Sequence, residues 1–315
     1  MKNESCDIMR EYFCGWYLKC QSNEHTLAVI PAFHKSNNKK SCSIQIITDT
    51  KAWNVDFPFE YFSKQKGRFD ISIKNNHFSS KGISLFINNP SLSVSGTLSF
   101  GEFTPIKYDI MGPFRYVPFM ECRHSVVSMK HTVNGSININ GKAYSFDNAA
   151  GYIEGDRGYS FPKRYIWTQC IFENGSLMLS VADIPFGLFS FTGIIGIIHV
   201  NKKEYRFATY LRAKAVKIEK GEIIIKQGDM MLSVNLLERN SQPLLAPVSG
   251  AMDRTIHESA SCRVAYSFQK QGQTIIEFET ANASLKMSIN GVHIVIFNIL
   301  VLLLLCIYYT DIVLE

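Results

Sequence analysis

The sequence lacks features that mark several common protein classes. Its eight cysteines include no C-x-x-C pair, the spacing typical of structural zinc sites. The net charge of +6 arises without a long Lys/Arg run, whereas a nucleic-acid-binding domain normally carries a basic stripe or a known motif. The first residues contain no apolar stretch typical of a secretory signal. We therefore expect no metal and no nucleic-acid partner, and buried reduced thiols in a cytoplasmic protein.

Tryptophan is scarce, with 3 residues, but 22 Phe and 14 Tyr are present. Phe and Tyr favour the pleated, half-buried surface of a sheet. No long amphipathic helix and no alternation of strands with helices is visible, which argues against parallel α/β architectures. Short runs that alternate apolar with polar residues recur instead, for example at 43–48, 69–73, 83–87, 92–100, 204–210, 222–226 and 231–237. Such a series predicts an all-β protein made of antiparallel barrels or sandwiches.

Tight turns are expected between several of these runs. Asn140-Gly141 lies between two strand-like segments and predicts a type I′ hairpin, because both residues tolerate positive φ. Asn134-Gly135 and Asn174-Gly175 fit tight turns as well. The turn signals therefore support a sheet of antiparallel neighbours.

The length of 315 residues suits about two domains. We expect one β domain over residues 1–150 and a second over residues 151–288, followed by an apolar tail over residues 289–315. Within the tail, residues 292–309 are 18 consecutive residues without a charged side chain. This length just suffices for a membrane-spanning helix. The tail is therefore either an apolar helix that contacts a membrane, a buried strand with an unusual end, or the product of an altered reading frame.

Residues 109–124 depart from simple strand patterning. The segment contains two prolines, and proline is confined to sheet edges, so we expect a shaped connection. One interpretation is a crossover loop packed over the mouth of a barrel. Glu121 and His124 are candidate functional residues, because ionisable groups among large apolar side chains must find partners or shift their pKa.

The strongest candidate for the functional centre is Gly151–Cys170, GYIEGDRGYSFPKRYIWTQC. Three glycines frame a predicted loop that carries Glu154, Asp156 and Arg157. Glycine allows close approach of the backbone, so these charged groups can lie near a ligand.

A strand is expected directly after this loop. Tyr165, Trp167 and Gln169 share one face of that strand, because successive side chains alternate, and Ile166, Thr168 and Cys170 share the other. The first face suits the wall of a pocket with one polar group. The alternative is a core strand in which Gln169 caps a buried backbone group.

The same segment resembles the hallmark region of tocopherol cyclases, in which a glutamate, a glycine loop, Phe-Pro, a basic residue, aromatics and Gln-Cys follow one another. The matching residues are Glu154, Gly158, Phe161, Pro162, Trp167, Gln169 and Cys170. Gly15–Lys19 is similar to the opening G-W-Y-x-K element of that family, and residues 111–124 are similar to a segment of bacterial members. The resemblance spans roughly residues 13–285.

This resemblance implies two lipocalin-like β-barrel domains in tandem and ring closure of a prenylated hydroquinone without a cofactor. It implies that Glu154 or Asp156 is the acid and that a hydrophobic small molecule is the partner. Arg157 stands where plant members carry an aromatic residue, so the entrance of the pocket is expected to differ. The expected substrate contacts are Trp167 and Tyr165 facing a cation, Gln169 holding the phenol, and Phe161, Arg157, Glu121, His124 and Trp16.

A non-catalytic binding protein is the alternative. The same pocket would then hold a hydrophobic quinone, isoprenoid or lipid without converting it. In that case Glu154 and Arg157 are expected to form a structural ion pair that braces the loop.

Overall fold

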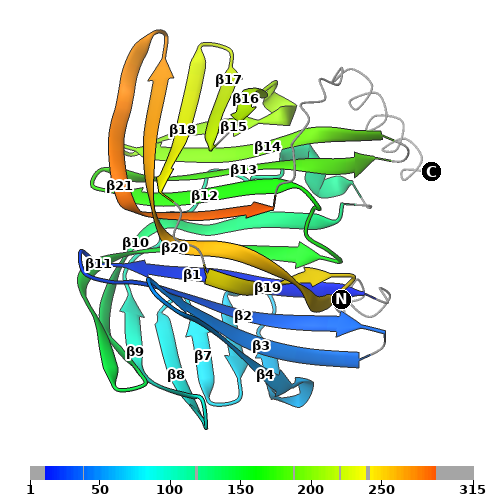
Figure 1. Cartoon of the computed structure of the whole chain (residues 1–315), viewed down its shortest axis with the longest axis vertical. Helices are drawn as coiled ribbons and strands as arrows, with labels where there is room; N and C mark the ends of the chain where they lie inside the picture. The colour runs from blue at the N-terminus through cyan, green and yellow to red at the C-terminus, as the bar shows by residue number, and fades with distance from the viewer. Residues whose placement is uncertain are drawn as a thin grey trace.

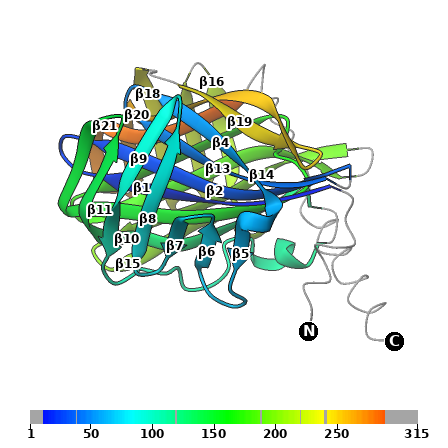
Figure 2. The same ribbon diagram turned by 90° about the horizontal axis from the view of Figure 1, so that it is seen from below.

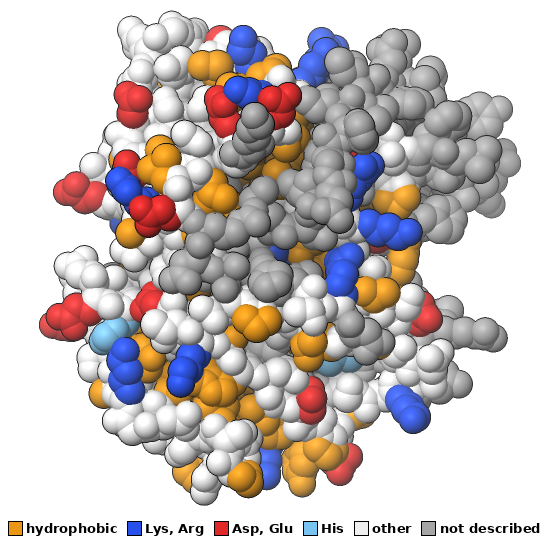
Figure 3. Space-filling view, in the orientation of Figure 1, with side chains coloured by type: hydrophobic (Ala, Val, Ile, Leu, Met, Phe, Trp, Pro, Cys, Tyr) orange, Lys and Arg blue, Asp and Glu red, His pale blue; other side chains and the backbone are white. Residues whose placement is uncertain are grey.

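A computed structural model describes residues 11–37, 39–117, 120–186, 189–219, 221–238 and 242–288. Two antiparallel β-sheets contain most of these residues and stack against each other (Figure 1). The all-β prediction is confirmed. On the face shown in Figure 3, Lys and Arg side chains lie interspersed with Asp and Glu, so the described surface there carries no stripe of one charge.

The first sheet has the strand order β4-β3-β2-β1-β11-β10-β9-β8-β7-β6-β5. Sequence neighbours pair with each other except β4 and β5, which form the two edges, and the first and last strands, β1 and β11, pair in the middle of the sheet. The strands are β1 (Tyr12–Gln21), β2 (Thr26–Ser36), β3 (Lys39–Thr48), β4 (Ala52–Pro58), β5 (Phe62–Lys64), β6 (Asp70–Ile73), β7 (Asn76–Ser79), β8 (Gly82–Asn89), β9 (Leu92–Phe100), β10 (Cys122–Ile139) and β11 (Lys142–Gly158).

The second sheet repeats this arrangement, with the order β15-β14-β13-β12-β21-β20-β18-β17-β16, and β19 also pairs with β20. Here the pair β12 and β21 joins the first and last strands. The strands are β12 (Tyr165–Phe172), β13 (Gly175–Phe186), β14 (Phe189–Val200), β15 (Lys203–Ala208), β16 (Lys214–Glu219), β17 (Glu222–Gln227), β18 (Met230–Glu238), β19 (Gln242–Val248), β20 (Ala251–Lys270) and β21 (Gln273–Ser288).

Short 3₁₀ helices interrupt the strands at Phe59–Tyr61 (η1), Gly112–Tyr116 (η2) and Thr209–Leu211 (η3). Among the described residues no helix is long and apolar enough to cross a membrane. The predicted tail 289–315, with its apolar stretch 292–309, lies outside the described residues.

Each sheet encloses its own apolar cluster, and a third cluster lies between the sheets. In the first sheet, β6 to β9 curl over β1, β2 and β3 (Figure 2), so that side chains such as Phe78 and Ile46 meet. In the second sheet, Phe207 and Phe268 belong to the enclosed cluster. The third cluster joins Tyr17 and Tyr152 of the first sheet to Trp167 of the second. The face shared by the two sheets is therefore as well buried as the cores themselves.

The connection between the sheets is short. β11 ends at Gly158 and β12 begins at Tyr165, so residues 159–164 link them. Residue 150, where we expected the boundary, lies inside β11 and is paired with both β1 and β10. The change from one sheet to the other thus comes after the glycine-rich segment, which forms a strand rather than the predicted loop.

Two Asn-Gly pairs adopt different structures. Asn140-Gly141 is the predicted hairpin between β10 and β11, with φ of 51° and 85°. Asn134-Gly135 lies inside β10, so the prediction of a turn there is wrong. The ladder shifts register at Gly135, whose φ is 121°, and a Cβ there would lie 2.3 Å from the Thr97 carbonyl oxygen. This glycine is needed for close strand packing rather than for reversing the chain.

Candidate functional site

Three ionisable side chains meet where β10 and β11 face the second sheet. His124 is paired with Asp156 across the ladder, and Glu154 lies two residues before Asp156 on the same face. The His124 ring lies between the two carboxylates. Its Nδ1 is 2.8 Å from Asp156 Oδ1, and its Nε2 is 3.3 Å from Glu154 Oε2. The strands thus place an imidazole in contact with one carboxylate on each of its nitrogens.

Glu154 is only 4% exposed, and its contacts converge on one oxygen. Oε2 accepts hydrogen bonds from the Tyr152 hydroxyl at 2.7 Å and from Trp167 Nε1 at 3.1 Å, in addition to the His124 contact. Within the described part of the chain, Oε1 accepts no hydrogen bond. One oxygen is therefore anchored, and the other is free of hydrogen bonds to the described residues.

The charges of this cluster are mutually dependent. Burial by itself opposes the charged form of His124, but Glu154 and Asp156 outweigh it and raise the pKa of His124 from 6.5 to about 10. For Asp156, burial is likewise outweighed by His124 and by Lys286, and its pKa is lowered. Near neutral pH the imidazole is therefore positively charged and Asp156 is ionised.

Lys286 of β21 is the fourth charged member of the cluster. Its Nζ lies 5.3 Å from the Phe161 ring centre and 5.8 Å from the Trp167 ring centre. The ammonium therefore lies beside Phe161 and beside Trp167, one of the two rings that sequence reasoning assigned to a cationic intermediate. Nothing in the local pattern SLKMS distinguishes this lysine from a surface residue, and only the pairing of β21 with β12 brings it to the site.

A cavity of about 100 Å³, here called the first lobe, opens beside this cluster. Apart from the charged cluster and Cys122, its walls are mostly apolar and come from both sheets and from the loop between β9 and β10. They comprise Met111, Phe114, Met120, Phe161, Pro162, Tyr165, Trp167, Ser180, Ala182, Ile184, Phe191, Gly193, Ile194 and Ile195. An apolar enclosure with a few convergent polar groups is the usual form of a small-molecule site.

A smaller cavity of about 50 Å³, the second lobe, lies on the other side of the cluster. Four residues line both lobes: Glu154, Asp156, Phe161 and Lys286. The remaining walls come from β1, β2, β3 and the region from β19 to β20, and they comprise Phe13, Gly15, Trp16, Tyr17, Ile30, Ala32, His34, Gln45, Leu244, Leu245, Pro247 and Met252. The charged cluster is therefore accessible from two directions.

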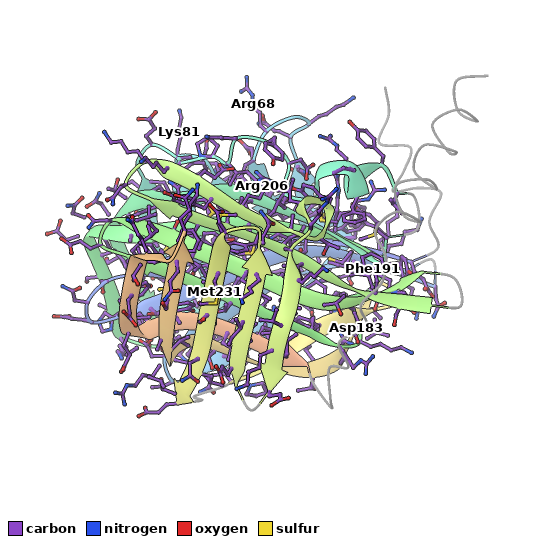
Figure 4. The ribbon with its side chains drawn as sticks, turned by 90° about the horizontal axis from the view of Figure 1, so that it is seen from above. Arg68, Lys81, Asp183, Phe191, Arg206 and Met231 are labelled. Carbon is purple, nitrogen blue, oxygen red and sulfur yellow. The ribbon has the colours of Figure 1, made fainter. Side chains whose placement is uncertain are left out.

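Arg206 of β15 fixes the loop that covers the first lobe. Its guanidinium donates to the carbonyl oxygens of Tyr108 at 2.9 Å and Asp109 at 3.1 Å, and it is paired with Glu204 at 3.1 Å. Figure 4 shows Arg206 on the side of the second sheet that faces this loop. Because the arginine is only 6% exposed, these charge-assisted hydrogen bonds are shielded from water.

Tyr210 completes this attachment. Its hydroxyl donates to the Ile110 carbonyl oxygen at 3.0 Å, and its ring packs on Gly112, where a Cβ would lie 2.5 Å from the ring. Phe114 of the loop then stacks on Phe191 of β14, with ring centres 5.9 Å apart. The segment is thus a shaped connection packed over the cavity, one of the interpretations its prolines suggested.

The structure brings most of the predicted site residues together. Glu154, Asp156, His124 and Phe161 border the first lobe with Tyr165 and Trp167, and Trp16 borders the second lobe. The predicted alternation in β12 is confirmed, because Tyr165 and Trp167 belong to the cluster between the sheets and Ile166 and Cys170 to the core of the second sheet.

Three predicted residues lie apart from the lobes. Arg157 is exposed, because it is three residues from Glu154 and so points to the opposite face of β11; the expected Glu154–Arg157 ion pair is therefore wrong. Glu121 is partly buried, and burial, opposed by Lys163 and Arg254, raises its pKa. Gln169 is fully buried, and neither of its amide atoms has a hydrogen-bond partner in the described part of the chain.

The cluster also contains donor atoms that a metal ion could use. One atom each from His124, Glu154 and Asp156 lies within 4.8 Å of the others. Of the two imidazole nitrogens, Nδ1 is hydrogen-bonded to Asp156, whereas Nε2 lies 3.3 Å from Glu154 Oε2 as an ion pair without a hydrogen bond.

Comparison with known proteins identifies a family and a fold. A family model described as tocopherol cyclase-like matches residues 90–287. A comparison with curated proteins gives no match. Solved structures with a similar fold include a putative AttH from Nitrosomonas europaea, with a TM-score of 0.52, 10% identity and coverage of 90% of this chain and 93% of that chain.

Two further structures share the fold. Kievitone hydratase from Nectria haematococca aligns with a TM-score of 0.50 and 12% identity, over 89% of this chain and 90% of that chain. CghA aligns with a TM-score of 0.55 and 7% identity, over 90% of each chain. At such identities the likeness concerns the fold alone.

Proposed function

This chain belongs to the tocopherol cyclase-like family, and from this premise we propose that it closes a ring in a prenylated hydroquinone, or a similar isoprenoid, by acid catalysis without a cofactor. Family membership supports enzymatic activity in a general sense. The observation that carries the specific proposal is the contact between His124 and Glu154 at the border of an apolar cavity.

Ring closure is an isomerisation, because the substrate gains one proton at carbon and loses one proton from oxygen. A proton is added to one carbon of a trisubstituted alkene, and the phenol oxygen forms a bond to the resulting tertiary cation. The phenol proton must then leave and the acid must be recharged. A protein therefore needs an acid beside the alkene, a base beside the oxygen, and a route for the proton between them.

The cluster suits these three requirements. Glu154, with Oε1 free of hydrogen bonds among the described residues, is proposed as the acid. Asp156, whose lowered pKa keeps it ionised, is proposed as the base that receives the phenol proton. Positively charged His124 can donate its Nε2 proton to Glu154, with which it is in contact. Asp156 then releases the phenol proton to water, and His124 takes up a proton from water at Nε2. Two carboxylates in different surroundings thus take opposite roles.

Lys286 favours one orientation of the substrate. An ammonium near Phe161 and Trp167 disfavours a carbocation on the same side of these rings, but it stabilises the negative charge that develops on a phenol oxygen. We therefore place the phenol oxygen near Lys286 and Asp156. The alkene would lie deeper in the first lobe, against Tyr165 and the apolar wall.

The proposal is tested by incubating the purified protein with prenylated hydroquinones in D₂O and analysing the products. The expected product is a chromanol with one deuterium on the ring carbon that received the proton. A hydrated, uncyclised product would show that water rather than the phenol captures the cation, and would contradict ring closure.

The second candidate is a non-catalytic binding protein for a hydrophobic quinone, isoprenoid or lipid. It is supported by the ion pairs of His124 with Asp156 and Glu154, at 2.8 and 3.3 Å, which a purely structural ion cluster would show as well. Tight binding of the hydroquinones with no product from any of them would decide in its favour.

A further inference from the structure

We propose that the second lobe is a recognition pocket for a hydroxyl group of the ligand, and that His34 binds this hydroxyl. The inference rests on the proposed function for the identity of the ligand. The lobe lies between β1 and β2 of the first sheet and the region from β19 to β20 of the second. It borders the charged cluster but lies opposite the apolar first lobe.

His34 has one engaged nitrogen and one unused nitrogen. Its Nε2 lies 2.9 Å from the Ser43 hydroxyl oxygen. The residue is only 5% exposed, and its buried Nδ1 atom has no hydrogen-bond partner among the described residues. His34 lines the lobe, and buried polar groups in folded proteins are normally hydrogen-bonded, so the unsatisfied nitrogen indicates a partner supplied by the ligand.

The protonation state of His34 determines which kind of ligand group it can bind. Burial, opposed by a smaller effect of Asp56, lowers the pKa of His34 to about 4, so the ring is neutral at pH 7. Depending on whether Nε2 donates to Ser43 or accepts from it, Nδ1 is an acceptor or a donor. A hydroxyl group can both donate and accept, so it matches either tautomer, whereas a charged group would be buried beside a neutral ring.

Gln45, another polar residue that lines the lobe, is not available for this role. Both polar atoms of the Gln45 amide are used by the Leu245 backbone, at 3.2 and 3.1 Å. Space in the lobe comes from small side chains: Gly15 is opposite Ala32 in the β1–β2 ladder, and a Cβ on Gly15 would lie 3.3 Å from the Ala32 Cβ. Away from the charged cluster, the lobe is therefore a small space in which His34 carries an unsatisfied polar atom.

The lining of the two cavities favours one ligand across both lobes, because Glu154, Asp156, Phe161 and Lys286 border both of them. A hydroquinone carries two hydroxyls on opposite ends of its ring. With the attacking oxygen beside Lys286 and Asp156 and the prenyl chain in the first lobe, the other hydroxyl would point into the second lobe toward His34.

The test compares the binding of two probes, farnesylated hydroquinone and its methyl ether at the hydroxyl that does not attack. We expect the native protein to bind the free hydroxyl about tenfold more tightly, the usual effect of one buried hydrogen bond. His34→Phe should lose this preference while binding the ether as before. Ala32→Leu, which fills the lobe, should weaken the binding of both probes.

His131→Phe is the matched control. His131 is also buried, with an Nε2 that has no partner among the residues described, but its ring packs against Gly151 and lines neither lobe. This variant should keep the tenfold preference. The inference is overturned if His34→Phe retains the preference, or if folded Ala32→Leu binds both probes like the native protein. Hydroxyl-dependent binding without any product would sink the proposed cyclase but not the role of His34.

Discussion

His124 faces Asp156 directly across the β10–β11 ladder, yet its ring also reaches diagonally to Glu154, the neighbour of Asp156 on the same face. One side chain thereby connects two carboxylates that their own strand holds apart. The contact depends on strict pairing of the two strands, so any change in their register would separate the three groups.

Replacing Glu154 by Gln should reduce turnover of prenylated hydroquinones by about 10²- to 10⁴-fold, the usual contribution of a general acid. The amide can still accept hydrogen bonds from Tyr152 and Trp167, so the fold should be retained. Steady-state kinetics and ligand binding would be measured on the same preparation. A variant that binds less tightly but turns over at the native rate would contradict the role of Glu154.

Replacing Trp167 by Phe removes the Nε1 donor to Glu154 but keeps an aromatic ring on the pocket wall. Because one of the anchors of Oε2 is lost, we expect kcat to fall while KM stays near its native value. The matched control is Tyr165→Phe, which leaves the hydrogen bonds of Glu154 intact. Equal losses in both variants would mean that aromatic packing alone matters.

Stability should decline as the pH rises above neutrality. The pKa of His124 is raised from 6.5 to about 10 in the folded protein, so its contribution to the free energy of unfolding is complete below about pH 6.5 and is lost as the pH rises through about 10. Urea unfolding from pH 7 to pH 10 should show this slope.

The slope should be weaker in His124→Gln. The buried residues His34 and His131 do not confound this measurement, because their pKa values are lowered to about 4 and their effects fall on the acid side. The same slope in the native protein and the variant would show that His124 is not the titrating group.

Replacing Arg206 by Met should destabilise the fold by about 3–5 kcal/mol, because Glu204 would be left buried without its partner. It should also raise KM, since the loop over the first lobe loses its attachment. Arg263→Met is the control. Arg263 also pairs with carboxylates, Glu238 and Glu279, but at the exposed surface, where ion pairs contribute little. Thermal unfolding and KM would be compared; equal effects in both variants would contradict the attachment.

Replacing Gln169 by Met should stabilise the protein by about 1 kcal/mol, because a buried amide without partners is removed at similar volume. Gln45→Met should instead destabilise the protein, because both amide atoms of Gln45 are hydrogen-bonded to the Leu245 backbone. Chemical unfolding gives both values. A selective loss of turnover in Gln169→Met at native stability would instead support the sequence-based expectation that Gln169 holds the phenol.

Local patterns predicted much of the fold. Alternating residues identified the strands, and the two faces of β12 follow directly from the period of two. The identical pairs Asn134-Gly135 and Asn140-Gly141 show what such local patterns cannot predict. Both permit positive φ, but one reverses the chain and the other lets β9 approach β10 closely, and only the neighbouring strand decides between them.

The candidate site was predictable in part. Glu154, Asp156 and Trp167 lie within one short segment, so their chemistry was visible in the sequence. Lys286 and His34 were not recognised, because strand pairing and sheet stacking bring them to the cluster from more than a hundred residues away. Arg157 was included for its charge, but its position in the strand directs it away from the cluster.

Residues 159–164 link two sheets, and each sheet carries only part of the site. The first sheet supplies the proton-handling groups, and the second supplies Trp167, Lys286 and most of the apolar wall. Each half could keep its own ladder of hydrogen bonds after cleavage of the link, but neither would retain an enclosed cavity. Activity would thus report on the docking of the halves, and a nicked protein would lose it upon dissociation and regain it upon reassembly.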